Sequence, residues 1–217
     1  MEVKVVREIL EANEVIAKQN KELFSQKGVY VLNLMGAPGT GKTTLLEKTI
    51  EMVKDRWPLA VIEGDIATSR DAERVARYGV QVVQINTGGA CHLDGNMVRE
   101  GLKALNLDGI RLLLVENVGN LVCPAEFNIG EDDKVMVLSV TEGDDKPLKY
   151  PLMFQVSSLL ILNKVDLLPY VDFDLEKFRD FTRKVNPRLE VIEVSCKTGQ
   201  GLQRWIEWLQ GRLEGRR

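Results

Sequence analysis

The chain has 217 residues, of which 44% are hydrophobic and 28% are charged. Its 29 basic and 32 acidic residues give a formal net charge of −3, so it lacks the basic excess that binding to a nucleic-acid backbone requires, and we expect no nucleic-acid partner. No apolar stretch approaches the roughly 20 residues that cross a bilayer, which argues against a membrane protein.

The cysteine count and the first residues indicate the compartment. Residues 1–12 are charged rather than apolar, unlike a secretory signal. The three cysteines are an odd number, and without such a signal they indicate reduced thiols rather than a disulfide framework. We therefore expect a cytoplasmic protein.

Apolar runs typical of strands alternate along the chain with segments whose apolar residues recur at helical spacing. Helices are predicted over residues 1–25 at the N-terminus, over 44–53 after the first strand, and over 200–214 as a closing helix. The predicted strands cover residues 29–34, 59–62, 80–85, 111–115, 134–140, 157–162 and 190–194. This alternation predicts an α/β fold in which helices flank both faces of a mainly parallel sheet of about seven strands. The length fits one domain over residues 1–217.

The first predicted strand leads into a G-x-x-x-x-G-K-T sequence, the pattern of a phosphate-binding loop. Backbone N–H groups of such a loop turn inward around phosphates, and the following helix directs its positive end at them. Lys42 would reach the β- and γ-phosphate oxygens, and the Thr43 hydroxyl would ligate Mg²⁺. The predicted nucleotide ligands are Gly36, Gly39, Thr40, Gly41, Lys42, Thr43 and Thr44.

A second motif selects the base. The predicted strand over 157–162 ends in Asn163, Lys164, Val165 and Asp166, an N-K-x-D sequence. An aspartate carboxylate accepts hydrogen bonds from the N1–H and 2-amino groups of guanine, and adenine offers neither donor there. GTP is therefore favoured over ATP. After the last predicted strand, Ser195, Cys196 and Lys197 occupy the position of the loop that packs over guanine in GTPases.

The only histidine of the chain, His92, follows Cys91 in the loop after one predicted strand, and Cys123 follows another strand. If these strands are neighbours, two thiolates and an imidazole converge on one cation at the carboxyl edge of the sheet. The spacing matches no zinc finger, so the pattern alone favours a buried cysteine and an ordinary loop histidine. Three ligands also leave a tetrahedral site one short, so the fourth position would be open or filled by water or a second subunit.

Five segments together resemble the hydrogenase nickel-incorporation GTPases, the HypB family. They are residues 36–44, 63–68, 91–94, 116–124 and 163–166. The strings C-H-L-D and E-N-V-G-N-L-V-C-P are the specific part, because the related urease accessory GTPase shares the phosphate-binding loop but not those strings. The resemblance covers residues 29–210 and implies a P-loop NTPase fold of the SIMIBI type.

The resemblance also assigns the metal ligands. Cys91, His92 and Cys123 match the family's site for nickel or zinc, near a nucleotide-dependent dimer interface, and this overrides the interpretation from spacing alone. Thiolate and imidazole suit both ions, so the choice between nickel and zinc stays open. Asp94 either orients His92 or caps the following helix.

The residues that the resemblance places around the phosphates are Asp65, Glu116 and Gly119. Asp65 would reach Mg²⁺ or orient the attacking water, and Glu116 would hold Mg²⁺ through water at the end of its strand. Lys42, Asp65 and Glu116 form the predicted catalytic set. Gly119 would bring its backbone N–H close to the γ-phosphate. The alternative for the two acids is a pair of solvated loop carboxylates.

Two further features concern partners. Lys146 and Lys149 would reach phosphates or a partner subunit, or belong to a solvated charged loop. Residues 1–28 contain neither cysteine nor histidine, unlike family members that bind or store nickel near the N-terminus. We therefore expect no nickel storage there and a separate nickel-binding protein.

The resulting prediction is a slow GTPase that helps to deliver nickel into [NiFe] hydrogenase, with a homodimer promoted by GTP. Its expected partners are a hydrogenase maturation factor and the hydrogenase large subunit. Two alternatives remain: a metallochaperone GTPase for another enzyme such as urease, and a non-catalytic module in which nucleotide only gates metal binding.

Overall fold

The computed structural model describes residues 4–65 and 70–215. Its strands form one seven-stranded sheet in the order β3-β2-β4-β1-β5-β6-β7, and every neighbouring pair is parallel. The strands are β1 (Tyr30–Met35), β2 (Leu59–Asp65), β3 (Gln81–Asn86), β4 (Leu112–Glu116), β5 (Asp133–Ser139), β6 (Leu159–Asn163) and β7 (Glu190–Glu193). The predicted α/β class and its mainly parallel sheet are confirmed.

Helices connect the strands. They are α1 (Lys4–Lys27), α2 (Lys42–Val53), α3 (Arg70–Ala76), α4 (Gly95–Leu102), α5 (Cys123–Glu126), α6 (Lys146–Lys149), α7 (Pro151–Val156), α8 (Leu175–Val185) and α9 (Leu202–Glu214), with 3₁₀ turns η1 (Val140–Glu142) and η2 (Val165–Tyr170). The first three residues of the predicted N-terminal helix, and residues 66–68 of the segment 63–68, lie outside the described part. Within that part, no helix has the length and apolar character needed to cross a bilayer.

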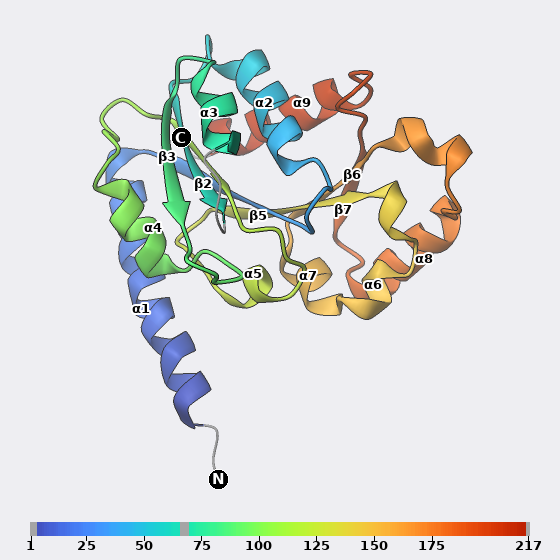
Figure 1. The fold of residues 1–217 in the computed structure, drawn as a ribbon, viewed down its shortest axis with the longest axis horizontal. Helices are drawn as coiled ribbons and strands as arrows, with labels where there is room; N and C mark the ends of the chain where they lie inside the picture. Colours follow the sequence, from blue (N-terminus) through green and yellow to red (C-terminus); the bar gives the residue numbers. More distant parts are fainter. Residues whose placement is uncertain (1–3, 66–69, 216–217) are drawn as a thin grey trace.

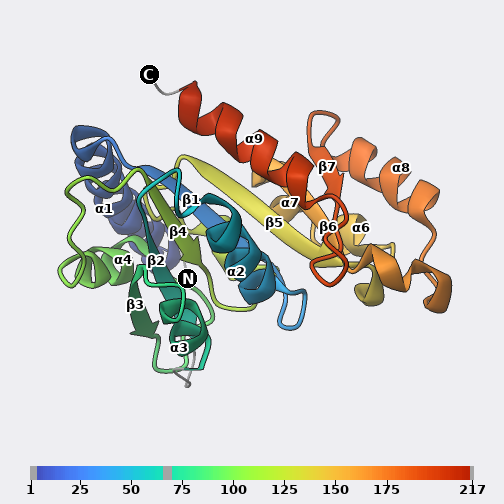
Figure 2. The ribbon, with the colours of Figure 1, turned by 90° about the horizontal axis from the view of Figure 1, so that it is seen from above.

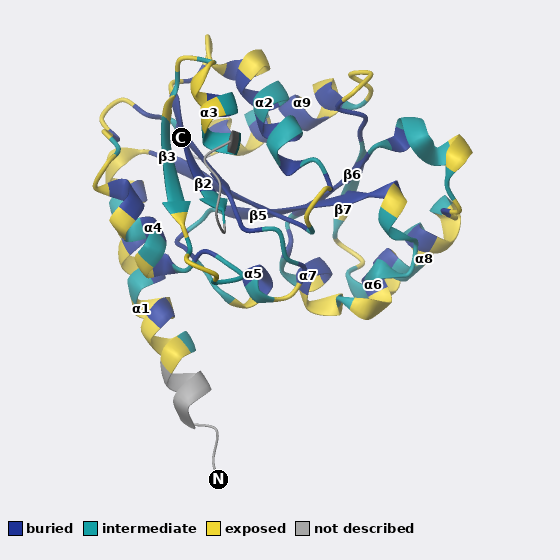
Figure 3. Cartoon of the chain, in the orientation of Figure 1, coloured by how far each residue is buried: buried dark blue, intermediate teal, exposed yellow. Residues whose placement is uncertain are grey.

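The helices form a layer on each face of the sheet (Figure 1). On one face, α2, α3 and α9 pack over the strands, and α2 and α9 lie in front of the sheet in Figure 2. On the other face, α1 and α4 cover one half of the sheet and α7 and α8 the other half. Because both faces are covered, the central strands are buried along their whole length, as Figure 3 shows for the middle of the sheet.

Two element boundaries differ from the prediction in a way that affects the site. Strand β2 continues to Asp65 rather than ending at residue 62, so Glu63 belongs to the sheet. Helix α2 begins at Lys42 rather than at residue 44, because the backbone N–H of Leu45 already donates to the carbonyl oxygen of Gly41 at the N-cap. Glu63 and Lys42 therefore lie in regular elements at the carboxyl edge of the sheet, where parallel α/β sheets bind ligands.

Candidate nucleotide and metal site

The loop between β1 and α2 closes around its own lysine. Gly41 has a positive φ of 96°, and a Cβ on it would lie 2.4 Å from Nδ2 of Asn163, so only glycine fits. Lys42 is 6% exposed and donates from Nζ to the carbonyl oxygens of Gly36 at 3.1 Å and Ala37 at 3.2 Å. Burial lowers the pKa of its amino group. A buried ammonium directed into the loop is suited to receive phosphate oxygens.

A cavity of about 520 Å³ adjoins this loop. Asp65, Glu116 and Gly119 lie in its wall together with Lys42 and Thr43, so the structure brings the predicted phosphate-site residues together. The Thr43 hydroxyl donates a hydrogen bond to Oε1 of Glu116 over 2.9 Å. The hydroxyl and the acid expected beside Mg²⁺ are therefore in direct contact.

A second cavity, of about 510 Å³, adjoins the first. It is lined by Gly41, Thr44, Asn163, Lys164, Asp166, Leu167, Cys196 and Lys197. At its edge Ser195 donates from Oγ to Oδ1 of Asp166 over 2.6 Å, and Oδ1 of Asn163 accepts the backbone N–H of Cys196 over 3.2 Å. The two segments that the sequence assigns to the base thus form one wall.

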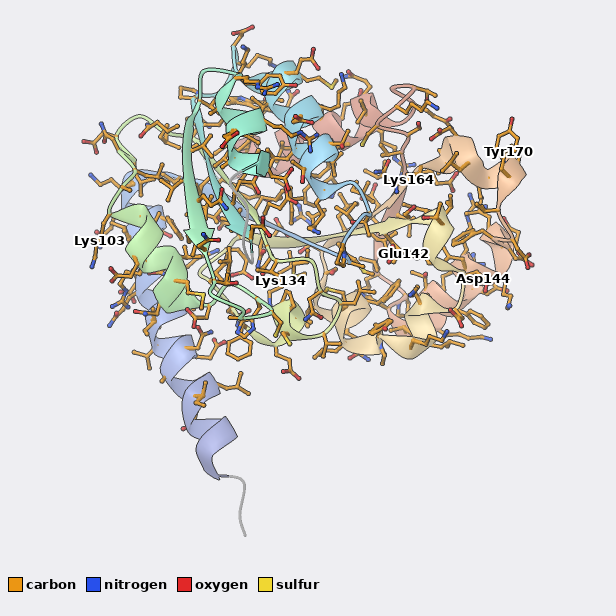
Figure 4. All side chains as sticks on the ribbon, viewed as in Figure 1. Lys103, Lys134, Glu142, Asp144, Lys164 and Tyr170 are labelled. Atoms are coloured by element: carbon orange, nitrogen blue, oxygen red, sulfur yellow. The ribbon has the colours of Figure 1, made fainter. Side chains whose placement is uncertain are left out.

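The base segment is also braced against the phosphate-binding loop. Nδ2 of Asn163 donates to the carbonyl oxygen of Thr40 over 2.9 Å. Lys164, labelled in Figure 4, donates from Nζ to the carbonyl oxygen of Gly39 over 2.6 Å. Because Gly41 and Lys164 line both cavities, phosphate and base regions form one continuous site.

Cys91, His92 and Cys123 form a cluster at the same edge of the sheet. Their potential ligand atoms all lie within 4.8 Å of one another. The Sγ atoms of Cys91 and Cys123 are 2.8 Å apart, and Sγ of Cys91 lies 3.6 Å from Nδ1 of His92. The ring of His92 stacks on Phe127, with centroids 3.9 Å apart. A soft divalent cation is the ligand that this donor set fits.

Burial and hydrogen bonding shift the pKa values of His92 and Cys123 in this cluster. Burial lowers the pKa of His92, against the opposing charges of Asp94 and Glu126, so the ring is available as a neutral ligand. The hydrogen bond with Cys91 raises the pKa of Cys123, and burial adds to the effect. A bound cation would favour deprotonation of both cysteines, because it binds each sulfur as a thiolate.

The two loops that carry these ligands do not leave adjacent strands. His92 follows β3 and Cys123 follows β4, and β2 lies between these strands in the sheet. The ligands meet because the segment after β3 crosses the end of β2. Adjacency of the strands, the condition attached to the prediction, is therefore not met, although the three side chains converge.

Comparison with known proteins identifies the family. Residues 30–193 match the family model described as "CobW/HypB/UreG, nucleotide-binding domain". The chain is 51% identical over 203 residues to hydrogenase maturation factor HypB of Escherichia coli K12, a match covering 94% of this chain and 70% of that protein. The chain belongs to the HypB family of hydrogenase maturation factors.

Solved structures of HypB support the assignment. HypB from Archaeoglobus fulgidus superposes with a TM-score of 0.88 at 42% identity, covering 94% of this chain and 99% of that one. HypB from Helicobacter pylori in complex with nickel also gives a TM-score of 0.88, at 37% identity over 94% of this chain and 96% of that one. The predicted SIMIBI-type P-loop NTPase fold and the family resemblance are confirmed, and the matched domain is a nucleotide-binding one.

Sequence reasoning missed Glu63, a buried acidic residue of this HypB site. Glu63 is 3% exposed and pairs in register with Glu116 on the neighbouring strand, so both carboxyl groups point to the same side of the sheet. Burial raises the pKa of both groups, and for Glu63 the charge of Glu116 adds to it. The signal that marks it is an acid two residues before Asp65 at the end of an apolar run.

The carboxyl pair provides a test of fit for Mg²⁺. Oε1 of Glu63 and Oε2 of Glu116 are buried without a hydrogen-bond partner among the described residues. Unpaired buried carboxylate oxygens beside the Thr43 hydroxyl form the hard oxygen donor set that Mg²⁺ prefers. The residues present therefore fit this ion.

We expect Glu63→Gln to stabilise the nucleotide-free protein in EDTA at neutral pH by about 1–3 kcal/mol. The raised pKa of Glu63 means that its carboxyl group must take up a proton on folding, whereas the amide is neutral in both states. The same substitution should weaken Mg²⁺-dependent nucleotide binding. Thermal unfolding in EDTA and nucleotide titration with and without Mg²⁺ measure the two effects. Glu51→Gln, on the exposed side of α2, is the matched control. Equal melting temperatures for wild type and Glu63→Gln would contradict a free-energy cost of burying the Glu63 carboxyl group.

Two further charged residues in the cavity wall were also not predicted. Asp71 and Arg74 lie on α3, and both line the phosphate cavity. Arg74 is held by Glu47 at 2.5 Å and by Asp71 at 3.0 Å. No sequence motif marks Arg74. It reaches the cavity only because the fold places α3 beside the phosphate-binding loop.

The remaining predicted residues have simpler contacts. The Asp94 side chain accepts the backbone N–H of Met97 over 2.7 Å and caps α4, the second of its two predicted roles. Lys149 pairs with Asp145 over 2.5 Å, and Lys146 lies 5.4 Å from the centre of the Tyr150 ring. In this structure the two lysines make contacts within their own exposed segment.

Proposed function

We propose that this chain is a GTP-hydrolysing metallochaperone that assists nickel insertion into [NiFe] hydrogenase. The observation that carries the proposal is the position of the Cys/His cluster beside the nucleotide cavity. Gly119 lies in the cavity wall, and Cys123 is the first residue of α5, at the end of the short segment that follows β4. A change in nucleotide state therefore acts within a few residues of a metal ligand.

In this proposal the chain's own groups position GTP for attack by water. Lys42 contacts the β- and γ-phosphate oxygens, the Gly119 N–H approaches the γ-phosphate, and Asp65 orients the water. Thr43, Asp65 and Glu116 would hold Mg²⁺, which neutralises phosphate charge when bound. Turnover is slow, because no arginine of the chain is marked by a motif as a finger and Arg74 in the cavity wall is held by Glu47 and Asp71. An arginine finger is worth roughly 10³–10⁵ in rate.

Nickel, or zinc in its place, is the cargo of Cys91, His92 and Cys123. These three ligands leave one tetrahedral position for water or a second copy of the chain, and the proposal includes a homodimer promoted by GTP. The partners are a hydrogenase maturation factor, the hydrogenase large subunit and a separate nickel-binding protein. The chain acts as one GTPase domain over residues 1–217 in the cytoplasm.

The test is a titration of purified protein with Ni²⁺ and Zn²⁺ in the presence of GDP or a non-hydrolysable GTP analogue. Charge-transfer absorbance and molecular mass are recorded together. We expect thiolate-to-nickel bands that strengthen as dimers form in the GTP-analogue state. Metal affinity and mass that are equal in both nucleotide states would contradict the switch. GTP turnover no faster than that of Lys42→Ala would favour a non-catalytic module.

Guanine selection is tested by Asp166→Asn. The amide donates where the carboxylate accepts, so the 2-amino group of guanine loses its partner, whereas the C2 carbonyl of xanthine gains one. We expect the variant's affinity for GTP to fall about 100-fold, and its affinity for xanthosine triphosphate (XTP) to exceed its affinity for GTP. Competition with a fluorescent nucleotide measures both constants.

Xanthine nucleotide serves as the internal control for this variant. A misfolded Asp166→Asn protein would lose both nucleotides, whereas a reversed preference requires an intact site. Unchanged preference for GTP in the variant would remove Asp166 from the base site.

A further inference from the structure

Asn117 makes an unusual set of buried contacts between the nucleotide cavity and the metal-ligand cluster. It follows β4 directly and is 1% exposed. Its Oδ1 accepts the backbone N–H of Leu93 over 2.9 Å and that of Val118 over 3.0 Å. Its Nδ2 donates to Oδ1 of Asn33 on β1 over 3.1 Å, and its backbone N–H donates to Leu34 over 2.9 Å. Both polar atoms of the side chain, Oδ1 and Nδ2, therefore make hydrogen bonds.

On the metal side, these contacts end at the residue after His92. Leu93 is fully buried, and its backbone N–H has Asn117 as its acceptor. Its side chain packs over Gly64 of β2, where a Cβ would lie 2.7 Å from Cδ1 of Leu93. The backbone next to His92 is therefore held from two directions, by Asn117 just after β4 and by Gly64 of β2, and both of these residues line the nucleotide cavity.

On the nucleotide side, Asn117 lies between the two groups proposed to contact Mg²⁺ and phosphate. Glu116 precedes it and accepts the Thr43 hydrogen bond. Val118 and Gly119 follow it in the cavity wall, and a Cβ on Gly119 would lie 2.8 Å from Pro38 of the phosphate-binding loop. Ordering of residues 117–119 around a γ-phosphate therefore sets the position of the Asn117 carboxamide.

We infer that Asn117 is the positioning residue that couples nucleotide state to metal affinity. This inference rests on the proposed function. A buried N–H without an acceptor is costly, so the Leu93 backbone follows the Asn117 oxygen when the 117–119 segment moves. That movement shifts Cys91 and His92 relative to Cys123, which lies on the other side of the same segment. The coupling is carried by packed groups and hydrogen bonds in contact along the whole distance.

The experiment compares Ni²⁺ affinity with GDP and with a non-hydrolysable GTP analogue, by competition with a chromophoric chelator. Wild type is expected to show a ratio of about 5- to 150-fold between the two states, the usual range for linked sites. In Asn117→Ala the ratio should fall to within about twofold of one, although all three metal ligands and Lys42 remain.

The matched control is Asn186→Ala. Asn186 makes the same types of contact far from the site, because its Nδ2 donates to the Phe154 carbonyl and its Oδ1 accepts the Arg188 N–H. This variant controls for the general loss of a structural carboxamide, and we expect it to keep the wild-type ratio. Asn117→Ala with a wild-type ratio would overturn the inference while leaving the proposed function standing.

A measurement on wild-type protein keeps the inference testable if Asn117→Ala does not fold. Amide hydrogen exchange at Leu93 is followed by NMR in the metal-free protein. We expect exchange with the GTP analogue to be slower than with GDP by at least about threefold, because the hydrogen bond to Asn117 is then more often closed. Equal exchange rates alongside nucleotide-dependent Ni²⁺ affinity would overturn the inference. If the Ni²⁺ affinity of the wild type is the same in both nucleotide states, the proposed switch itself is overturned.

Discussion

Lys42→Ala is expected to weaken GTP binding at least about 100-fold, on the order of 3 kcal/mol, and to reduce GTP turnover to background. Lys42 is 6% exposed, and among the described residues its ammonium donates hydrogen bonds to the loop carbonyl oxygens of Gly36 and Ala37. Phosphate oxygens carry more charge than these carbonyls and would replace them as acceptors. Without the lysine, the cavity presents the carboxyl groups of Glu63 and Glu116 to an anionic ligand.

Lys48→Ala is the matched control, because Lys48 lies on the same helix but pairs with Glu51 at the surface. We expect it to bind GTP as the wild type does. Titration with a fluorescent GTP analogue gives the affinities, and thermal unfolding shows whether each variant is folded. A folded Lys42→Ala protein that bound GTP within threefold of wild type would contradict the assignment of this loop.

The strands were predictable because each is an apolar run bounded by polar or turn residues, and all seven predicted strands overlap an observed one. The neighbour relations were not predictable in the same way, because apolar runs define strands but not their order. The placement of β2 between β3 and β4 therefore had to come from the structure. His92 and Cys123 converge across that intervening strand.

The residues of the site also divide into those that the sequence identifies and those that only the structure reveals. Lys42 and Asp166 are marked by motifs whose spacing reflects the chemistry of phosphate and guanine, so the sequence alone points to them. Glu63 was missed because the apolar run ends at Ile62 and a following acid reads as loop. Its burial depends on register with Glu116, which is a tertiary property. Asn117 gives no chemical signal in sequence either, because its role depends on the contact with Leu93.

Cys123→Ala is expected to lower Ni²⁺ affinity at least about 100-fold and to abolish the thiolate-to-nickel band, and Cys91→Ala should have a similar effect. The two sulfurs are 2.8 Å apart, so each variant removes half of the thiolate donors of the cluster. His92 and one thiolate cannot hold a soft cation against a competing chelator. Chelator competition and absorbance spectra measure the loss.

Cys196→Ala is the control that separates a ligand from a structural thiol. Cys196 is a free cysteine 6% exposed in the base segment, and burial raises its pKa to about 11. Such a thiol stays protonated at neutral pH and is a poor metal ligand. We expect this variant to bind Ni²⁺ as the wild type does. A loss as large as that of Cys123→Ala would mean that the cluster at the sheet edge is not the metal site.

Molecular mass of the same variants tests whether the metal contributes to the dimer interface. The cluster offers three potential ligand atoms, so a tetrahedral ion bound there would have one position left for a second copy or for water. If a second copy supplies it, Cys123→Ala loses the metal-dependent part of dimerisation but keeps the part promoted by the GTP analogue. If water supplies it, mass is independent of metal in every variant. Because binding is reciprocal, the first result also predicts that dimer formation tightens Ni²⁺ binding in the wild type.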